Sequence, residues 1–268
     1  MFYRNDCEGF KDIDMGKIRE GSVITTKNFG DVVITKYVDK DNVHIRFINT
    51  GYNLITQSLN IRQRTIKDRL APAVFGVGVV GDALTAVDGV RLKEYELWKN
   101  MIKRCYSKSY HEKYPTYSSC SVSENFKYYP YFKEWCNKQD GFTSQDENGN
   151  YFQLDKDILV KGNKVYSEEL CVFVPKEINL LLVKCGRKRG DNPIGVFYDA
   201  KNDKYKAQMA GKGASKTFIG RYVTPEEAFQ AYKQAKEAYI KEVANKWKDQ
   251  IDVRVYKALM KYQVEITD

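Results

Sequence analysis

The fold of this chain is decided by the stretch KYKAQMAGKGASKTFIGRYVTPEEAFQAYKQAKEAYIKEV, residues 204–243. Its first half predicts two strands, 204–209 and 216–222, joined by a glycine-rich turn at 211–214. A helix is expected to follow, because Thr224 can cap it, Pro225 suits its first position and Glu227 completes a capping box. Its expected inner stripe is Ala228, Tyr232, Ala235, Tyr239 and Val243. With a further strand expected at 194–198, the stretch predicts a three-stranded sheet packed on one helix.

The other face of this sheet is expected to be free. Tyr205, Ala207 and Met209 alternate toward the helix, so the side chains between them project outward. Gly220 interrupts the alternation on the last strand. The outward residues are expected to be Lys204, Lys206, Gln208, Lys216, Phe218 and Arg221. Lysines neutralise phosphates, Gln208 can pair with a base edge and Phe218 can contact a sugar or thymine methyl, which favours duplex DNA. The alternative is a solvated face on a sheet that only packs.

Charge distribution agrees with a polyanionic partner. The 268 residues carry a formal net charge of +9 and include 20 Tyr and 13 Phe. From Lys184 onward there are 18 Lys and Arg and 11 Asp and Glu, a net charge of +7. The opening MFYRNDCEGF has no apolar core of signal-peptide length, and no run approaches the ~20 apolar residues of a membrane span. We therefore expect a soluble, intracellular protein that contacts no membrane. The alternative to a polyanionic partner is that the lysines only solvate the surface.

Six scattered cysteines make zinc an unexpected cofactor. They form no CxxC pair and have no neighbouring His at a zinc spacing, so most are expected to be reduced, half-buried side chains. The six are Cys7, Cys105, Cys120, Cys136, Cys171 and Cys185. The alternative is a structural metal site formed by Cys105, Cys120, Cys136 and Cys171.

The N-terminal segment predicts a small β-barrel over about residues 15–75. Three runs rich in Val, Ile and Phe, at 22–26, 31–38 and 42–48, are separated by turn-forming residues. Val43, Ile45 and Phe47 are expected inside, with His44 directed to solvent. This barrel is the expected contact for a protein partner.

The middle segment predicts one helix followed by irregular structure and a hairpin. Residues 93–107 place Leu97, Trp98, Met101, Ile102 and Cys105 on one apolar stripe. His111 is expected in a solvated loop, and the glycine-rich residues 74–82 are expected to be a connecting strand or linker. Apolar runs at 152–159 and 171–175, with a turn at 161–163, predict the hairpin.

The C-terminal segment resembles the Apetala-type DNA-binding domain of plant ethylene-response factors, which also occurs in phage and bacterial nucleases. The residues that carry this resemblance are Gly195–Val196, 204–209, 217–222 and 224–232. The resemblance implies a sheet that enters the major groove, with contacts at Phe197, Asp199, Gln208, Lys216 and Phe218. Phe197 and Asp199 stand where the plant domains have arginines, so plant-like sequence preference is not expected.

The middle segment resembles phage-encoded HNH endonucleases, which often carry an Apetala-type domain at the C-terminus. The resemblance lies in WKNMIKRCY at 98–106, FKEW at 132–135, QLDKD at 153–157, YSEELCVFVP at 166–175 and Asn179. It implies a catalytic set of Asp155, Lys156, Asp157 and Asn179. Of these, Asp155, Asp157 and Asn179 would hold Mg²⁺ or another divalent cation. The implied setting is a phage or mobile element expressed in the cytoplasm of a bacterial host.

Two departures from the HNH pattern leave the activity open. Lys156 stands where the family has its His base, and Leu170 where it has its middle Asn. One hypothesis is metal-dependent DNA nicking or cleavage. The other is a catalytically decayed relative that occupies a DNA site as a transcriptional regulator or anti-defence protein. A pure protein-interaction module is a third class, which would leave the basic C-terminal face unexplained.

The sequence thus predicts an α+β protein of three parts. These are a small β-barrel at 1–80, a degenerate HNH unit at 81–183, and an Apetala-type unit with a C-terminal helix at 184–268.

Overall fold

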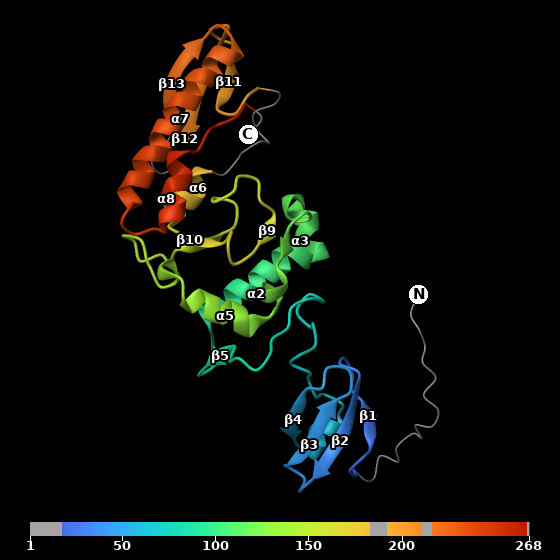
Figure 1. Ribbon diagram of the computed structural model, residues 1–268. Coiled ribbons are helices and arrows are strands. Elements are labelled where there is room, and N and C mark those ends of the chain that lie inside the picture. Colours follow the sequence, from blue (N-terminus) through green and yellow to red (C-terminus); the bar gives the residue numbers. More distant parts are fainter. Residues whose placement is uncertain (1–17, 183–191, 211–215, 267) are drawn as a thin grey trace. The chain divides into compact units, whose positions relative to one another are not determined.

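The computed structural model describes residues 18–182, 192–210, 216–266 and 268 (Figure 1). The chain is of mixed α+β class with several small sheets, as predicted. It divides into two compact units, one of residues 1–118 and 124–132 and the other of residues 119–123 and 133–268. Cys7, Cys185, the expected turn at 211–214 and the expected boundary at 184 lie outside the described residues.

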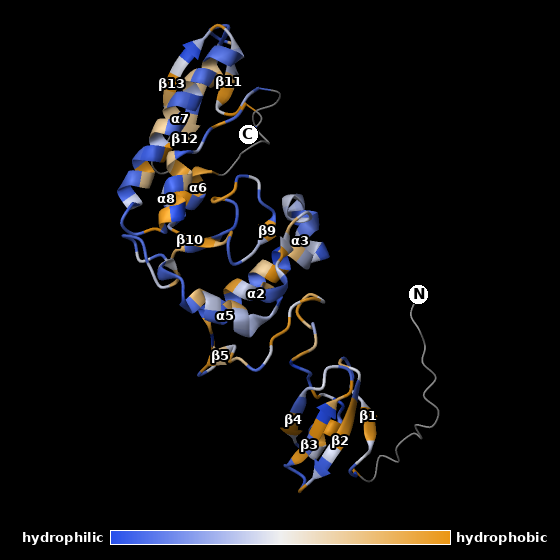
Figure 2. Cartoon of the chain, in the orientation of Figure 1, coloured by the Kyte–Doolittle hydropathy of each residue, from blue (hydrophilic) through white to orange (hydrophobic). Residues whose placement is uncertain are grey.

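The N-terminal part of the first unit is a four-stranded antiparallel sheet. Its strands are β1 (Val23–Thr25), β2 (Asp31–Tyr37), β3 (Val43–Phe47) and β4 (Asn53–Thr56), in that order. Figure 2 shows hydrophobic and hydrophilic residues in both β2 and β3, and in β3 they alternate along the strand, VHIRF. The predicted inward set is confirmed, since Val43, Ile45 and Phe47 are 0%, 1% and 0% exposed.

The prediction of a closed barrel is wrong. Among the described residues β1 pairs only with β2 and β4 only with β3, so both outer strands remain sheet edges. The two edge strands are short, with 3 and 4 residues, and the buried face is covered instead by Ile61 of α1 (Ser58–Arg62) and by Ile66. Alternating residues indicate which face of a strand is buried, but not whether the sheet closes.

The rest of the first unit is built around Trp98. A small hairpin, β5 (Ala86–Val87) and β6 (Val90–Arg91), precedes α2 (Lys93–Tyr106), α3 (Lys108–Lys113) and the 3-10 helix η1 (Pro115–Tyr117). Helix α4 (Glu124–Lys127) follows, and then α5 (Tyr129–Asn137), whose residues from Lys133 onward belong to the second unit. Trp98 is fully buried and its Nε1 donates to the Phe126 carbonyl at 2.8 Å.

Residues 74–82 form a connecting segment, as expected, and Phe75 within it is 38% exposed. The segment is fixed at Gly78, which is buried and where an added Cβ would lie 3.0 Å from the Trp98 ring. One expectation for this region needs correction. His111 lies in α3 rather than in a solvated loop. Its Nε2 donates to the Arg104 carbonyl at 2.8 Å, since a carbonyl oxygen can only accept.

The second unit begins with short strands and a hairpin. Strands β7 (Ser121–Val122) and β9 (Val165–Tyr166) form a parallel pair, and β8 (Gln153–Asp155) and β10 (Val172–Val174) form an antiparallel pair. The two pairs alternate along the chain. A 3-10 helix, η2 (Asp140–Phe142), precedes β8, and α6 (Lys176–Leu181) follows β10. Strand β10 is buried along its whole length, as its apolar run predicts.

The C-terminal part of the second unit confirms the predicted sheet and helix. Strands β11 (Val196–Asp199), β12 (Lys204–Ala210) and β13 (Lys216–Tyr222) form an antiparallel sheet, and α7 (Pro225–Trp247) covers one face (Figure 1). Thr224 Oγ1 accepts from the Glu227 N–H at 3.2 Å, and Glu227 accepts from the Thr224 N–H, which is the expected capping box. Helix α8 (Val253–Met260) ends the fold.

Helix α7 also joins this sheet to the hairpin of the same unit. Its last residue, Trp247, is buried and meets the Phe152 ring edge-on at a centroid distance of 5.9 Å. Trp247 Nε1 and Lys246 Nζ both donate to one oxygen of Glu177 on α6, each at 2.8 Å. The helix therefore belongs to two cores, one under the sheet and one beside α6.

The cysteines of the described residues are buried at positions 105, 120, 136 and 171. Burial raises the pKa of the Cys171 thiol to about 12. In the part of the chain that the structure describes, no three or more His, Cys, Asp and Glu side chains are grouped to hold a metal ion. No helix in the described ranges is both long and apolar enough to span a membrane.

Candidate nucleic-acid interface

The outer face of the C-terminal sheet gathers the residues that the sequence singled out. Lys206 of β12 stands between Phe197 of β11 and Arg221 of β13, and Gln208 stands opposite Phe218. Directly opposed residues of antiparallel strands project from the same face. Lys204 opposes Asp199 and Lys216 opposes Ala210, which places both lysines on this face too. We call this set the outer sheet face: Phe197, Asp199, Lys204, Lys206, Gln208, Lys216, Phe218 and Arg221.

A β-bulge explains how Phe218 and Arg221 share that face although they are three positions apart. The register shifts between Ala207, which opposes Gly220, and Gln208, which opposes Phe218. Ile219 is the extra residue and packs with the core under α7. Gly220 is needed here, because an added Cβ would lie 2.8 Å from the Tyr222 hydroxyl oxygen. The interruption that Gly220 makes in the sequence pattern is thus the bulge itself.

Asp199 is the electrostatic centre of the outer sheet face. Its Oδ2 accepts from Arg221 Nε at 3.0 Å and from Asn202 Nδ2 at 2.8 Å, and lies 3.1 Å from Lys206 Nζ. Hydrogen bonds from Arg221 and Asn202, together with Lys206, hold the pKa of this carboxyl well below its usual range. Asp199 therefore stays ionised and holds two cations in fixed positions.

The two phenylalanines of this face are paired with cations. Lys216 Nζ lies 5.5 Å from the Phe197 ring centroid, and the Arg221 guanidinium carbon lies 5.1 Å from that of Phe218. Phe218 is 51% exposed, which is high for a large apolar side chain. Cations over exposed rings produce a surface that offers both a flat apolar contact and positive charge.

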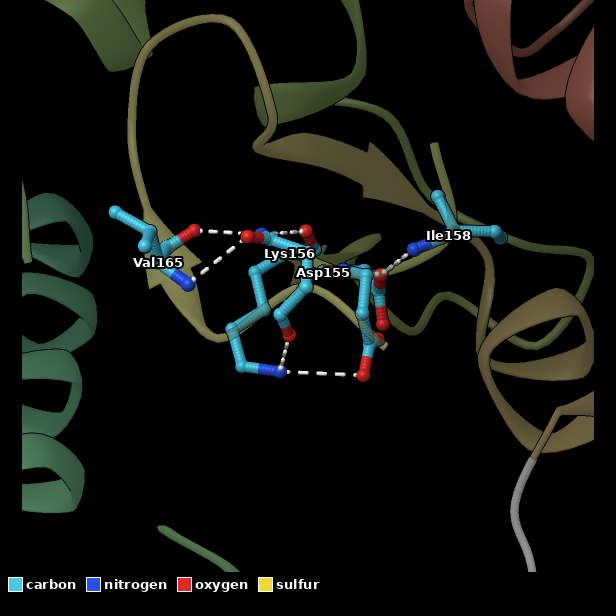
Figure 3. Close-up of polar contacts among 6 residues, drawn as sticks. Asp155, Lys156, Ile158 and Val165 are labelled. Carbon is cyan, nitrogen blue, oxygen red and sulfur yellow. Dashed lines mark hydrogen bonds and ion pairs between the residues drawn. The ribbon is translucent and has the colours of Figure 1, made fainter. Parts of the chain in front are cut away.

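The central hairpin places the other predicted residues in a compact polar turn (Figure 3). The Asp155 carboxylate accepts from the backbone N–H groups of Asp157 and Ile158, at 2.9 and 2.8 Å. Burial, and then the nearby Asp157 carboxylate, raise the pKa of Asp155. The side chain thus shapes the end of β8, as an Asp at a turn commonly does.

Lys156 closes the loop between β8 and β9. Its Nζ donates to Asp157 Oδ2 and to the Asn163 carbonyl, both at 3.1 Å, and lies 5.7 Å from the Tyr166 ring centroid. Asn163 returns a hydrogen bond to the Lys156 carbonyl at 2.6 Å (Figure 3). The side chain of Lys156 is only 9% exposed, whereas that of Asp157 is 47% exposed, so the lysine is buried in this loop and reaches out to a half-exposed carboxylate.

Asn179, the third expected metal ligand, is bonded elsewhere. Its Nδ2 donates to Gln153 Oε1 at 2.7 Å, which links α6 to the start of β8. Lys156 already neutralises Asp157, and an ammonium and a divalent cation compete for the same carboxylate. In this arrangement Asp155, Asp157 and Asn179 do not fit a shared divalent cation.

Sequence reasoning missed the partners that hold these residues in place. Asn202, which binds Asp199, follows three residues after it in a turn, and such a spacing is a recognisable signal of a side chain bonded across a turn. Asn163 stands beside Gly162 in the predicted turn and gives a similar signal. Glu177 gives none, because its partners Lys246 and Trp247 are about 70 residues away in the chain.

A comparison with known protein families, with curated proteins and with solved structures finds no match to this chain.

Proposed function

We propose that this protein binds duplex DNA through the outer sheet face and acts by occupying its site. The observation that carries the proposal is that Gln208 opposes Phe218 on this face. The neighbouring pair on the same face is Lys206 opposite Arg221. An amide can hydrogen-bond to a base edge and a phenyl ring can contact a thymine methyl, whereas the cations fit phosphates. A sheet is narrow enough to enter the major groove.

The mixture of residues on this face supports a specific reader of DNA rather than a simple polyanion binder. Four cations, at positions 204, 206, 216 and 221, surround the neutral Phe197, Gln208 and Phe218. Asp199 removes part of the positive charge and fixes Lys206 and Arg221 in place. Ordered cations lose less conformational freedom on binding than mobile ones, and their fixed positions set the register of the sheet on DNA.

Occupancy is favoured over cleavage by the ion pair at the central hairpin, in which Lys156 is buried and Asp157 is half-exposed. Cleavage by an HNH-type site needs a general base and a divalent cation next to the scissile phosphate. The ammonium of Lys156 can serve neither purpose while it is bonded to Asp157 and the Asn163 carbonyl. The rival function, metal-dependent nicking, draws its support from the two adjacent carboxylates of Asp155 and Asp157.

Selection from a random duplex library, followed by gel-shift titration of the enriched duplex, tests the proposal. We expect an enriched sequence that the full-length protein binds on the order of 10³-fold more tightly than scrambled duplex, as specific readers do. The matched control is the double variant Gln208→Ala with Phe218→Ala, which should enrich no sequence. Equal binding of enriched and scrambled duplexes by the wild type would contradict the proposal.

Incubation with supercoiled plasmid separates occupancy from cleavage. The wild-type protein should retard the plasmid on a gel and leave it supercoiled with Mg²⁺ or Mn²⁺. Nicking that requires the cation and disappears in Asp157→Ala would favour the rival function instead.

A further inference from the structure

A second group of cations and aromatic rings lies on α2, α3 and η1 of the first unit. Tyr110 meets Tyr114 at a centroid distance of 4.7 Å and Tyr117 at 5.6 Å. Each ring also has a cation nearby: Lys103 at 5.7 Å from Tyr110, Lys113 at 5.5 Å from Tyr114 and Arg104 at 5.8 Å from Tyr117. We call these six residues the tyrosine cluster.

This region is strongly basic. Residues 99–117 contain five Lys and Arg and one Glu, a net charge of +4 within 19 residues. Lys103, Lys108 and Lys113 are exposed, and among the described residues none of the three has a carboxylate partner. Carboxylates normally accompany lysines on a surface of mixed charge, so an unbalanced group of this size favours an anionic partner.

The elements that present these residues are fixed in position. The opposite face of α2 is anchored in the core by Trp98, Met101, Ile102 and Cys105. Ser107 caps α3 by accepting from the Tyr110 N–H, and His111 of α3 donates to the Arg104 carbonyl of α2. The cluster is therefore a preorganised surface, which lowers the ordering cost of binding.

We infer that the tyrosine cluster, together with Lys108, is a second contact for DNA and binds the phosphate backbone of a duplex. Single-stranded nucleic acid would need open ring faces on which bases stack. Here Tyr110 and Tyr117 are half-buried and pack on each other, and of the three rings only Tyr114 is exposed, at 42%, so there is no row of open rings and the lysines are the principal groups for a ligand. The inference rests on the proposed function in taking DNA as the partner, but it concerns residues that the sheet does not include.

The salt dependence of binding by the full-length protein tests this contact. Each phosphate neutralised adds about 0.9 to the slope of log affinity against log salt. The triple variant Lys103→Ala, Lys108→Ala, Lys113→Ala should lower this slope by about 2 to 3 on enriched and scrambled duplexes alike. The corresponding triple Lys→Arg variant should keep the wild-type slope, because it keeps the charge.

The matched control removes three exposed lysines from the N-terminal sheet region of the same unit: Lys36→Ala, Lys40→Ala, Lys67→Ala. It makes the same change in net charge and should shift the slope by less than about 1. An unchanged slope in the cluster variant, or an equal loss in the control, would overturn this inference while leaving the sheet proposal intact. A loss confined to single-stranded DNA would also overturn it. Absence of duplex binding by the wild type would overturn both proposals.

Discussion

Gln208 and Lys204 lie on the same strand and the same face but should contribute to binding in different ways. Gln208→Ala should cost about 1 to 3 kcal/mol on the enriched duplex and little on scrambled DNA, because an amide that reads a base edge carries sequence information. Lys204→Ala should weaken binding to both duplexes equally and lower the salt slope by about 1. Anisotropy titrations over a salt series measure both effects. Identical behaviour of the two variants would contradict the assignment of Gln208 to base reading.

Asp199 is expected to limit affinity and to improve discrimination. Asp199→Asn removes one negative charge and releases Lys206 and Arg221 from fixed positions. Scrambled duplex should then bind more tightly, with a salt slope steeper by about 1, while the ratio of specific to non-specific affinity falls. The same titrations measure this ratio. An increased ratio would show that the carboxylate opposes site recognition.

Asp155 should make the protein less stable as pH rises. The pKa of its carboxyl is raised in the folded state, so the folded protein binds this proton more tightly than the unfolded chain does. Proton binding therefore stabilises the fold fully below the ordinary pKa of 3.8, and this stability is lost as pH rises through the folded pKa. Asn can still accept the two backbone hydrogen bonds of Asp155 but cannot ionise. In urea unfolding from about pH 4 to about pH 7, Asp155→Asn should remove this loss.

Asp146 provides a control of opposite sign. Hydrogen bonds from Asn150 lower the pKa of its carboxyl, so its stabilising contribution is present above 3.8 and is lost as pH falls. Asp146→Asn should therefore flatten the acid side of the stability profile. A profile unchanged by both substitutions would mean that these two carboxyls do not determine the pH dependence.

Helix α7 shows how a single element can be predicted locally and still have an unexpected role. Its capping box, its proline at the first position and its contact with the sheet follow from residues close in sequence. Its contacts with Phe152 and Glu177 join segments about 70 to 95 residues apart, which no local pattern reveals. The bulge beside Gly220 is an intermediate case. The glycine indicated that the strand is irregular there, but not which residues of β12 and β13 oppose each other.

The same limit explains the errors in the N-terminal and central regions. Alternation indicated the buried residues of β3, but barrel closure depends on pairing between distant edges, and the fourth strand, β4, was not predicted. The LDKD pattern indicated two carboxylates beside a lysine at a strand end. That Lys156 is bonded to Asp157 and to the Asn163 carbonyl depends on how the loop folds back. The sequence pattern therefore located the polar segment but not the hydrogen bonds made within it.

Trp247 should stabilise the second unit through both its ring and its Nε1 group. Trp247→Ala should lower the free energy of unfolding by about 3 to 5 kcal/mol, the usual cost of removing a buried aromatic side chain. Trp247→Phe keeps a ring near Phe152 but loses the hydrogen bond to Glu177, so it should cost clearly less. Urea unfolding of the three proteins gives the order. Equal stability of wild type and Trp247→Ala would contradict the joint role of α7.

For the protein as a whole we propose two DNA contacts, one on each unit. In this proposal the outer sheet face would supply the groups that distinguish bases, and the tyrosine cluster would supply positive charge. Sequence preference should therefore follow changes on the sheet alone, whereas the total salt dependence should respond to both surfaces.

Photocrosslinking from the sheet tests most directly whether its outer face is the one that reads DNA. Positions 218 and 198 are matched, since Phe218 is 51% and Tyr198 52% exposed, but they project from opposite faces. Each is replaced in turn by p-benzoylphenylalanine in the full-length protein, which is then irradiated with the enriched duplex. We predict crosslinks to DNA from position 218 and none from position 198. Retained DNA binding with crosslinks from position 198, or with equal crosslinks from both positions, would contradict the account.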